Sequence, residues 1–98
     1  MIILYEEEQG FVGLSYEENL QVYLMHVDLY KWTPSEFKRY LKIFDVIKKH
    51  VKTITPEVYS ICDTEKEFKF NKMFGFEDTG LMAEQEDGNI GKIGRLIL

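Results

Sequence analysis

Short apolar runs open the chain and predict strands over residues 1–6, 11–16 and 20–29. Acidic or glycine-containing turns separate these runs, as is typical of hairpin connections. Both faces of the third run, LQVYLMHVDL, are largely apolar, so we expect a central strand that is covered on both sides. The first third of the chain is therefore predicted to be a three-stranded antiparallel meander.

A long amphipathic helix is predicted to follow. The segment TPSE at residues 33–36 combines a capping threonine, a proline suited to the first turn, and a glutamate that can reach back to the cap. Apolar residues then recur at spacings of three and four up to Val51, and basic residues occupy the opposite side. This pattern predicts that the apolar stripe, with Phe44 near its middle, packs on the sheet.

The second half of the chain predicts one more strand, a short helix and a closing hairpin. The strand covers residues 57–62, and a second Thr-x-x-Glu motif opens the helix at Thr64. Gly75 is predicted to end that helix as a left-handed residue, with Phe76 making the apolar contact of a Schellman motif. Residues 79–86 and 89–98 then form the hairpin.

The order of elements is therefore βββ-α-β-α-ββ. It predicts an α+β or α/β fold in which a mixed sheet carries at least two helices, built as a single domain over residues 1–98.

Length and composition narrow the class of protein. A chain of 98 residues with 45% hydrophobic residues can build one core, which excludes a disordered chain. No run approaches the roughly 18 apolar residues of a membrane span, and no basic residue precedes the first apolar run as in a secretory signal. The single cysteine, Cys62, excludes an internal disulfide and a CxxC metal site. We expect a cytoplasmic protein that needs no metal.

Charge is unevenly distributed along the chain. The net charge of −5 argues against a nucleic-acid partner. Half of the 12 Lys and Arg residues nevertheless lie within residues 34–52, on the predicted long helix. They indicate either a solvated helix face or a surface for an anionic ligand or partner. The glutamates at positions 6, 7 and 8 are expected to form a solvated turn.

The element order, together with the segment KFNKMFGF at residues 69–76 and the following Gly80, resembles the GNAT-type N-acetyltransferase superfamily. Members of that family commonly end their last helix with a similar Gly-Phe before a closing hairpin. The resemblance covers the whole chain but only the later part of the family fold, because the family's first strand and first two helices have no counterpart here. It implies that acetyl-coenzyme A would lie where the central strand and the next one splay apart.

The resemblance also implies a set of candidate cofactor-binding residues. They lie at the end of the central strand, in the loop that follows, on the start of the long helix and on the later helix: Leu29, Tyr30, Lys31, Trp32, Ser35, Lys38, Arg39 and Asn71. The loop has no glycine to fold around a pyrophosphate, and Glu36 places negative charge where the phosphates would sit. We therefore expect no cofactor, with acetyl-coenzyme A as the cofactor only if the chain is an enzyme.

Three residues are candidates for catalysis. His26 and Asp28 share a face of the central strand, where the family often places its general base, and a neighbouring carboxylate would raise the pKa of the histidine. The alternative is a core histidine bonded to backbone. The family's proton-donating tyrosine corresponds to Asn71, which we expect on the exposed side of its helix, so Tyr59 is the remaining candidate acid.

Two classes of function remain. The first is a non-catalytic or degenerate GNAT-like domain used for binding or assembly, and the alternative is a divergent acetyl-coenzyme A-dependent N-acetyltransferase. The sequence identifies no small-molecule or protein partner, and neither nucleic acid nor membrane is expected as one.

A homodimer through a sheet edge is also expected. Residues 1–5 carry no inward charge, proline or bulge that would block pairing with another chain. The alternative is that the long helix or the closing hairpin covers these residues.

Overall fold

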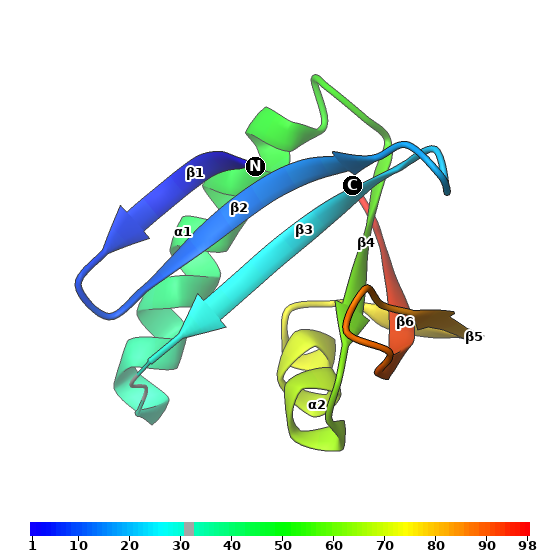
Figure 1. The fold of residues 1–98 in the computed structure, drawn as a ribbon. Helices are drawn as coiled ribbons and strands as arrows, with labels where there is room; N and C mark the ends of the chain where they lie inside the picture. The colour runs from blue at the N-terminus through cyan, green and yellow to red at the C-terminus, as the bar shows by residue number, and fades with distance from the viewer. Residues whose placement is uncertain (31–32) are drawn as a thin grey trace.

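The computed structural model describes residues 1–30 and 33–98, which form a mixed α+β fold (Figure 1). The strands are β1 (Ile2–Glu7), β2 (Gly10–Glu17), β3 (Val22–Leu29), β4 (Glu57–Cys62), β5 (Glu77–Glu84) and β6 (Ile90–Ile97). The helices are α1 (Pro34–Val51) and α2 (Glu65–Met73). The predicted order of elements is confirmed. The described residues contain no helix that is long and apolar enough to cross a membrane.

The strands form one six-stranded mixed sheet in the order β1-β2-β3-β4-β6-β5. The first three strands are the predicted antiparallel meander, and β5 and β6 are the predicted hairpin. β3 and β4 run parallel, which requires a crossover connection, and α1 supplies it. Because β6 lies between β4 and β5, α2 also spans a crossover between parallel strands.

Both helices pack on the same face of the sheet. The ring of Phe74, just past the end of α2, lies 5.5 Å from the ring of Phe37 and 5.0 Å from that of Phe44, both on α1. Phe44 and Phe74 are only 2% and 4% exposed, as their helical spacing predicts. Burying two large aromatic rings at the helix–helix–sheet junction makes this the centre of the core.

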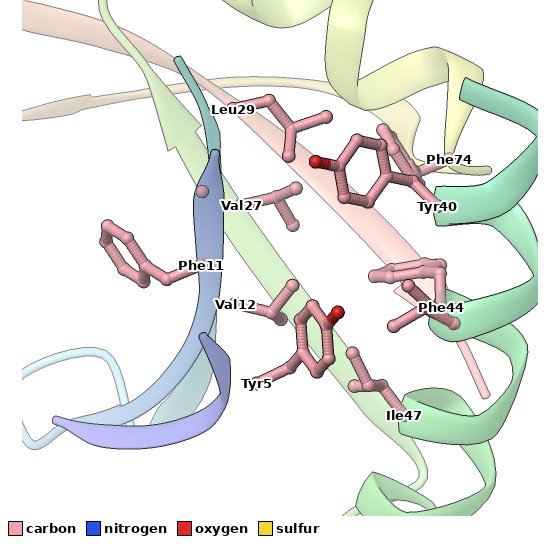
Figure 2. A pocket seen from close by; sticks show the side chains of 11 residues that line it. Tyr5, Phe11, Val12, Val27, Leu29, Tyr40, Phe44, Ile47 and Phe74 are labelled. Carbon is pink, nitrogen blue, oxygen red and sulfur yellow. The ribbon is translucent and has the colours of Figure 1, made fainter. Parts of the chain in front are cut away.

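A small apolar cavity remains between α1 and the strands (Figure 2). Tyr5 and Val12 point from the sheet toward Phe44 and Ile47 of α1, whereas Phe11 points to the other side of the strand. The cavity volume is about 10 Å³, at the lower limit for one water molecule. This space belongs to the packed core and is too small for a ligand.

Both helix starts and one helix end follow the predicted local chemistry. The hydroxyl of Thr33 accepts the N–H of Glu36 at 3.3 Å, and that of Thr64 accepts the N–H of Glu67 at 3.1 Å. The reciprocal bonds are not made, because the Glu36 carboxylate binds Arg39 and the Glu67 carboxylate accepts the N–H of Asp63. Only half of each predicted capping box therefore forms.

The end of α2 is the predicted Schellman motif. Gly75 has φ +100°, its N–H donates to the carbonyl of Lys72, and the N–H of Phe76 donates to the carbonyl of Asn71. Phe76, at the position where this motif places its apolar residue, is buried and only 2% exposed.

Several predicted strand properties are wrong. β3 begins at Val22 rather than at residue 20, because Gln21, with φ 56°, turns the chain first and Leu20 is exposed. Its outer face is not covered either, since both helices lie on the other side and leave His26 and Asp28 exposed. In the last hairpin, β5 lies two residues earlier than the predicted range 79–86, and β6 is one residue shorter at each end than the predicted range 89–98.

β1 lies at one end of the sheet, as predicted, but it is not free of irregularity. The register of β1 against β2 shifts between Ile3 and Tyr5, which places a bulge at Leu4. The expectation that no bulge interrupts this edge is therefore wrong. Ile2 and Ile3 remain 63% and 45% exposed.

Candidate functional site

A cleft lies where β3 and β4 separate. In the described residues these two parallel strands pair at a single position, Leu24 with Tyr59, and then diverge toward the start of α1 and of α2 (Figure 1). The cleft between them has a volume of about 960 Å³, within the range of small-molecule sites. The sheet thus opens at the carboxyl ends of two parallel strands, the usual place for a ligand in sheets of this kind.

Apolar side chains form one part of the walls of this cleft. They come from β2, β3, β4 and α2: Phe11, Leu24, Met25, Val27, Leu29, Ile61, Phe70 and Met73. The polar side chains at the cleft are at least as numerous, and those at the start of α2 include Thr64, Lys66, Glu67 and Lys69. The lining therefore suits a slender ligand that carries both apolar and polar groups.

A buried thiol and a buried amide lie together at the cleft. Asn71 is 8% exposed and its side-chain N–H donates to Sγ of Cys62, with 2.7 Å between Nδ2 and Sγ. The expectation that Asn71 lies on the exposed side of α2 is therefore wrong: its side chain turns toward β4, where the thiol offers an acceptor. Burial raises the pKa of Cys62, while Asn71 and Ser60 oppose that shift. The thiol stays neutral and is a weak nucleophile.

His26 and Asp28 lie on one face of β3, as the sequence predicts, and both line the cleft, but no hydrogen bond joins them in the described part of the chain. Nε2 of His26 lies 2.9 Å from the hydroxyl of Ser15 on β2. Desolvation lowers the pKa of His26, in contrast to the expected rise. The expected alternative of a core histidine bonded to backbone is also wrong, since the ring is exposed and bonds a side chain.

Tyr59, the remaining candidate acid, lies outside the cleft lining. Its hydroxyl donates to Oε1 of Glu57 at 3.1 Å. Burial is the larger of the causes that raise the pKa of the phenol, and the Glu57 carboxylate is the second. A tyrosine held in this way does not reach the space between the diverging strands.

The candidate cofactor residues divide into two groups. Leu29, Tyr30 and Asn71 line the cleft, whereas Ser35, Lys38 and Arg39 on α1 do not. The remaining two, Lys31 and Trp32, lie outside the described residues. The end of β3 and the helix α2 thus meet at the cleft, but the first turns of α1 lie outside it.

Arg39 is engaged by carboxylates of its own chain. It makes a bidentate contact with Glu7, at 3.0 and 2.7 Å, and it also bonds Glu36 at 2.9 and 2.7 Å. Its guanidinium lies 4.6 Å from the centre of the Tyr40 ring. These carboxylates raise the pKa of Arg39 and neutralise its charge locally.

Glu7 is therefore not part of a solvated turn. Its carboxylate also accepts hydrogen bonds from the hydroxyls of Tyr5 and Tyr40. Together with Arg39, these donors lower the pKa of Glu7 from 4.5 to about 2. We call the set Tyr5, Glu7, Glu36, Arg39 and Tyr40 the Glu7 network; it ties β1 to the first turns of α1.

Sequence reasoning missed both the Cys62–Asn71 contact and the Glu7 network. The first had a usable signal, since helical spacing places Asn71 near Phe68 and Phe74, which are buried. The second joins residues that are 32 positions apart, so no local pattern marks it. The described residues contain no cluster of three His, Cys, Asp or Glu side chains that could hold a metal ion.

Comparisons of this chain with models of protein families, with curated proteins and with solved structures found no match.

Proposed function

We propose that this chain is a GNAT-like domain that binds a ligand in the cleft between β3 and β4 and does not transfer an acetyl group. One observation carries the proposal: β3 and β4 run parallel, pair at Leu24 and Tyr59, and then separate around a space of about 960 Å³. In the GNAT-type family the corresponding strands splay in this manner and hold acetyl-coenzyme A in the opening. The order of elements agrees with the later part of that fold.

The start of α1 argues against the nucleotide part of coenzyme A. Thr33 already caps the helix, and Pro34 offers no N–H to a phosphate. Arg39, in the second turn of α1, is bound by Glu7 and Glu36. A pyrophosphate would have to displace these carboxylates and would approach their negative charge, so its binding would be weak.

The residue at the family's acid position is not a proton donor. Asn71 stands at the family's acid position, and a carboxamide does not donate a proton to a leaving thiolate. Tyr59 is outside the cleft, and the neutral thiol of Cys62 is held by Asn71. These features support a binding role for the cleft.

One observation favours the alternative, a divergent acetyl-coenzyme A-dependent N-acetyltransferase. His26 lines the cleft, and its lowered pKa keeps the imidazole neutral near neutral pH, as a general base must be. This alternative requires a proton donor other than Asn71, which occupies the family's acid position.

Calorimetric titration with acetyl-coenzyme A, combined with an assay for coenzyme A release, separates the two functions. We expect a dissociation constant no tighter than about 0.1 mM, equivalent to about 5.5 kcal/mol, and no turnover. Low-micromolar affinity with release of coenzyme A would contradict this proposal and favour the alternative, an N-acetyltransferase.

The cleft itself is tested by an NMR titration of the backbone amides with pantetheine, a slender probe without a nucleotide. Shifts are expected at the ends of β3 and β4, and Ile61→Trp should abolish them by filling the cleft. Ile93→Trp is the matched control, since Ile93 pairs with Ile61 across the sheet but does not line the cleft. Shifts that persist in Ile61→Trp, or their absence in the native chain, would contradict binding in the cleft.

A further inference from the structure

The two strands that border the cleft each keep one open edge toward it. β3 pairs with β2 along its whole length, and β4 pairs with β6 in the same way. Between β3 and β4, however, the described residues pair only at Leu24 and Tyr59. Beyond that pair, alternate backbone N–H and C=O groups of both strands face the cleft without a strand opposite them, as they do at the edge of a sheet.

Open edges of this kind favour an extended peptide as the ligand. A peptide carries N–H and C=O groups at the spacing of a strand, so it can hydrogen-bond to an edge by strand addition. A purely apolar chain would instead cover the same backbone groups and leave them without hydrogen bonds, which is costly. A ligand that fills this cleft therefore needs amide groups along its length.

One flank of α2 forms the wall beside these edges. Lys66, Lys69, Phe70 and Met73 all line the cleft, and their spacing of three and four residues places them on one side of the helix. Both lysines are exposed, and neither forms an ion pair with a carboxylate in the described ranges 1–30 and 33–98. The flank thus changes along the helix from basic to apolar.

The acids near this flank do not neutralise the lysines. Glu65 forms an ion pair with Lys92 of β6, and the carboxylate of Glu67 accepts the N–H of Asp63. Asp28, the other acid at the cleft, lies on β3 and is exposed on the sheet face that the helices do not cover. The α2 wall therefore offers two cations to a ligand of opposite charge.

We propose that the ligand of the cleft is an extended acidic peptide, which pairs with an open strand edge and directs its carboxylates toward Lys66 and Lys69. The proposal rests on the proposed function, because it names the ligand of the same cleft. Successive side chains of an extended peptide point to opposite faces of the sheet, so every second one faces α2. In that row, acidic side chains meet the two lysines and an apolar one meets Phe70 and Met73.

NMR titrations with three blocked hexapeptides test this ligand class. The peptides alternate valine with glutamate, glutamine or lysine, so they share a backbone and differ in charge. The glutamate peptide should shift the amides at the ends of β3 and β4 and should bind on the order of tenfold tighter than the lysine peptide, with a smaller preference at high salt. The same glutamate peptide, N-methylated along its backbone, should bind on the order of tenfold more weakly, because it has lost the N–H groups that pair with a strand.

Charge reversal on α2 tests the direction of the carboxylates. Combining Lys66→Glu with Lys69→Glu should reverse the preference, so that the lysine peptide becomes the tighter ligand. Lys72→Glu is the matched control, because Lys72 lies on the same helix but does not line the cleft. Should the double variant fold poorly by circular dichroism, the comparison of peptides on the native chain decides.

Three results would overturn the acidic peptide. They are equal affinities of the three peptides for the native chain, an N-methylated peptide that binds as well as its parent, and a Lys72→Glu variant as strongly affected as the double variant. A pantetheine titration distinguishes the peptide from the cleft itself. Shifts with pantetheine but none with the glutamate peptide would overturn the peptide alone, whereas no shifts with either would overturn the proposed function as well.

Discussion

α1 and α2 both begin at a threonine whose hydroxyl accepts the N–H of a glutamate three residues later. At α1 the carboxylate of Glu36 turns to Arg39, which also binds Glu7 on a distant strand. At α2 the carboxylate of Glu67 stays at its own helix start and accepts the N–H of Asp63. The same local signature thus leads its glutamate into a long-range ion network at one helix and into a local bond at the other, where a different residue, Glu65, makes the ion pair with Lys92 of β6.

The difference decides which helix start can meet a ligand. Arg39 in the first turns of α1 is neutralised within the chain and lies outside the cleft, whereas Thr64, Lys66 and Lys69 of α2 line it. A capping motif therefore shows where a helix begins, but it does not show which charges remain available there. Four substitutions separate the two helix starts, beginning with the residue that contacts both helices.

Phe74 joins the two helices, so its removal should have the largest effect. Its ring contacts Phe37 and Phe44 on α1 and lies 5.0 Å from Phe70 on α2. Phe74→Ala should lower the free energy of unfolding by about 3–5 kcal/mol, a large share of the stability of a small domain. Urea denaturation measures the change. Met73→Ala, at a neighbouring position that is 43% exposed, should change it by less than about 0.5 kcal/mol. A native-like midpoint for Phe74→Ala would contradict this packing.

Glu7→Gln should cause the next largest loss of stability, through the contacts that hold the start of α1. The pKa of Glu7 falls from 4.5 in the unfolded chain to about 2 in the folded one, so its ion pair stabilises the fold above pH 4.5. That stabilisation is lost as the pH falls toward 2, where the folded carboxylate becomes protonated. Native and variant chains should therefore differ in stability at pH 7 and become equal near pH 2.

Subtracting the stability of Glu7→Gln from that of the native chain at each pH isolates the contribution of Glu7. Arg95 and Lys92 lower the pKa of Glu57 and Glu65, and both chains keep that acid sensitivity. Glu8→Gln is the control, because Glu8 is exposed and lies next to the network. A difference between native and Glu7→Gln that stays constant from pH 7 to pH 2 would show that the carboxylate's charge contributes nothing.

Local signals in the sequence were sufficient to predict much of the fold. The threonine caps, the Schellman end of α2 and the buried stripe of α1 each depend on residues within one or two helical turns. The splay of β3 and β4 was expected only through the family resemblance, because it depends on how the two halves of the sheet twist relative to each other.

The misplaced site residues have a common physical origin. Asn71 was expected to be exposed because it is polar, yet the thiol of Cys62 gives it a buried partner. Glu7 belongs to a run of three glutamates, and only the fold brings Arg39 and Tyr40 to it. In each case the partner that fixes the position of the side chain lies on another element. Hydrophobic periodicity within one element does not reveal such a partner.

The smallest predicted effect compares the two caps directly. Thr33→Ala and Thr64→Ala each remove one acceptor for a backbone N–H, a loss of about 0.5–2 kcal/mol. At α1 the Glu7 network still holds Arg39 and Tyr40 against β1, so loss of the cap should fray only the first turn. α2 has only nine residues, and a single ion pair between Glu65 and Lys92 of β6 holds its first turn, so Thr64→Ala should be the more destabilising of the two.

Urea denaturation of the two variants, with Thr33→Ser and Thr64→Ser as controls that keep the hydroxyl, measures this difference. Both serine variants should remain close to the native chain, because serine caps helices as well as threonine does. Combining Thr33→Ala with Glu7→Gln should then cost more than the sum of the two single changes, because the network no longer holds the uncapped turn. Additive effects, or a Thr33→Ala variant less stable than Thr64→Ala, would show that the ion network does not support the start of α1.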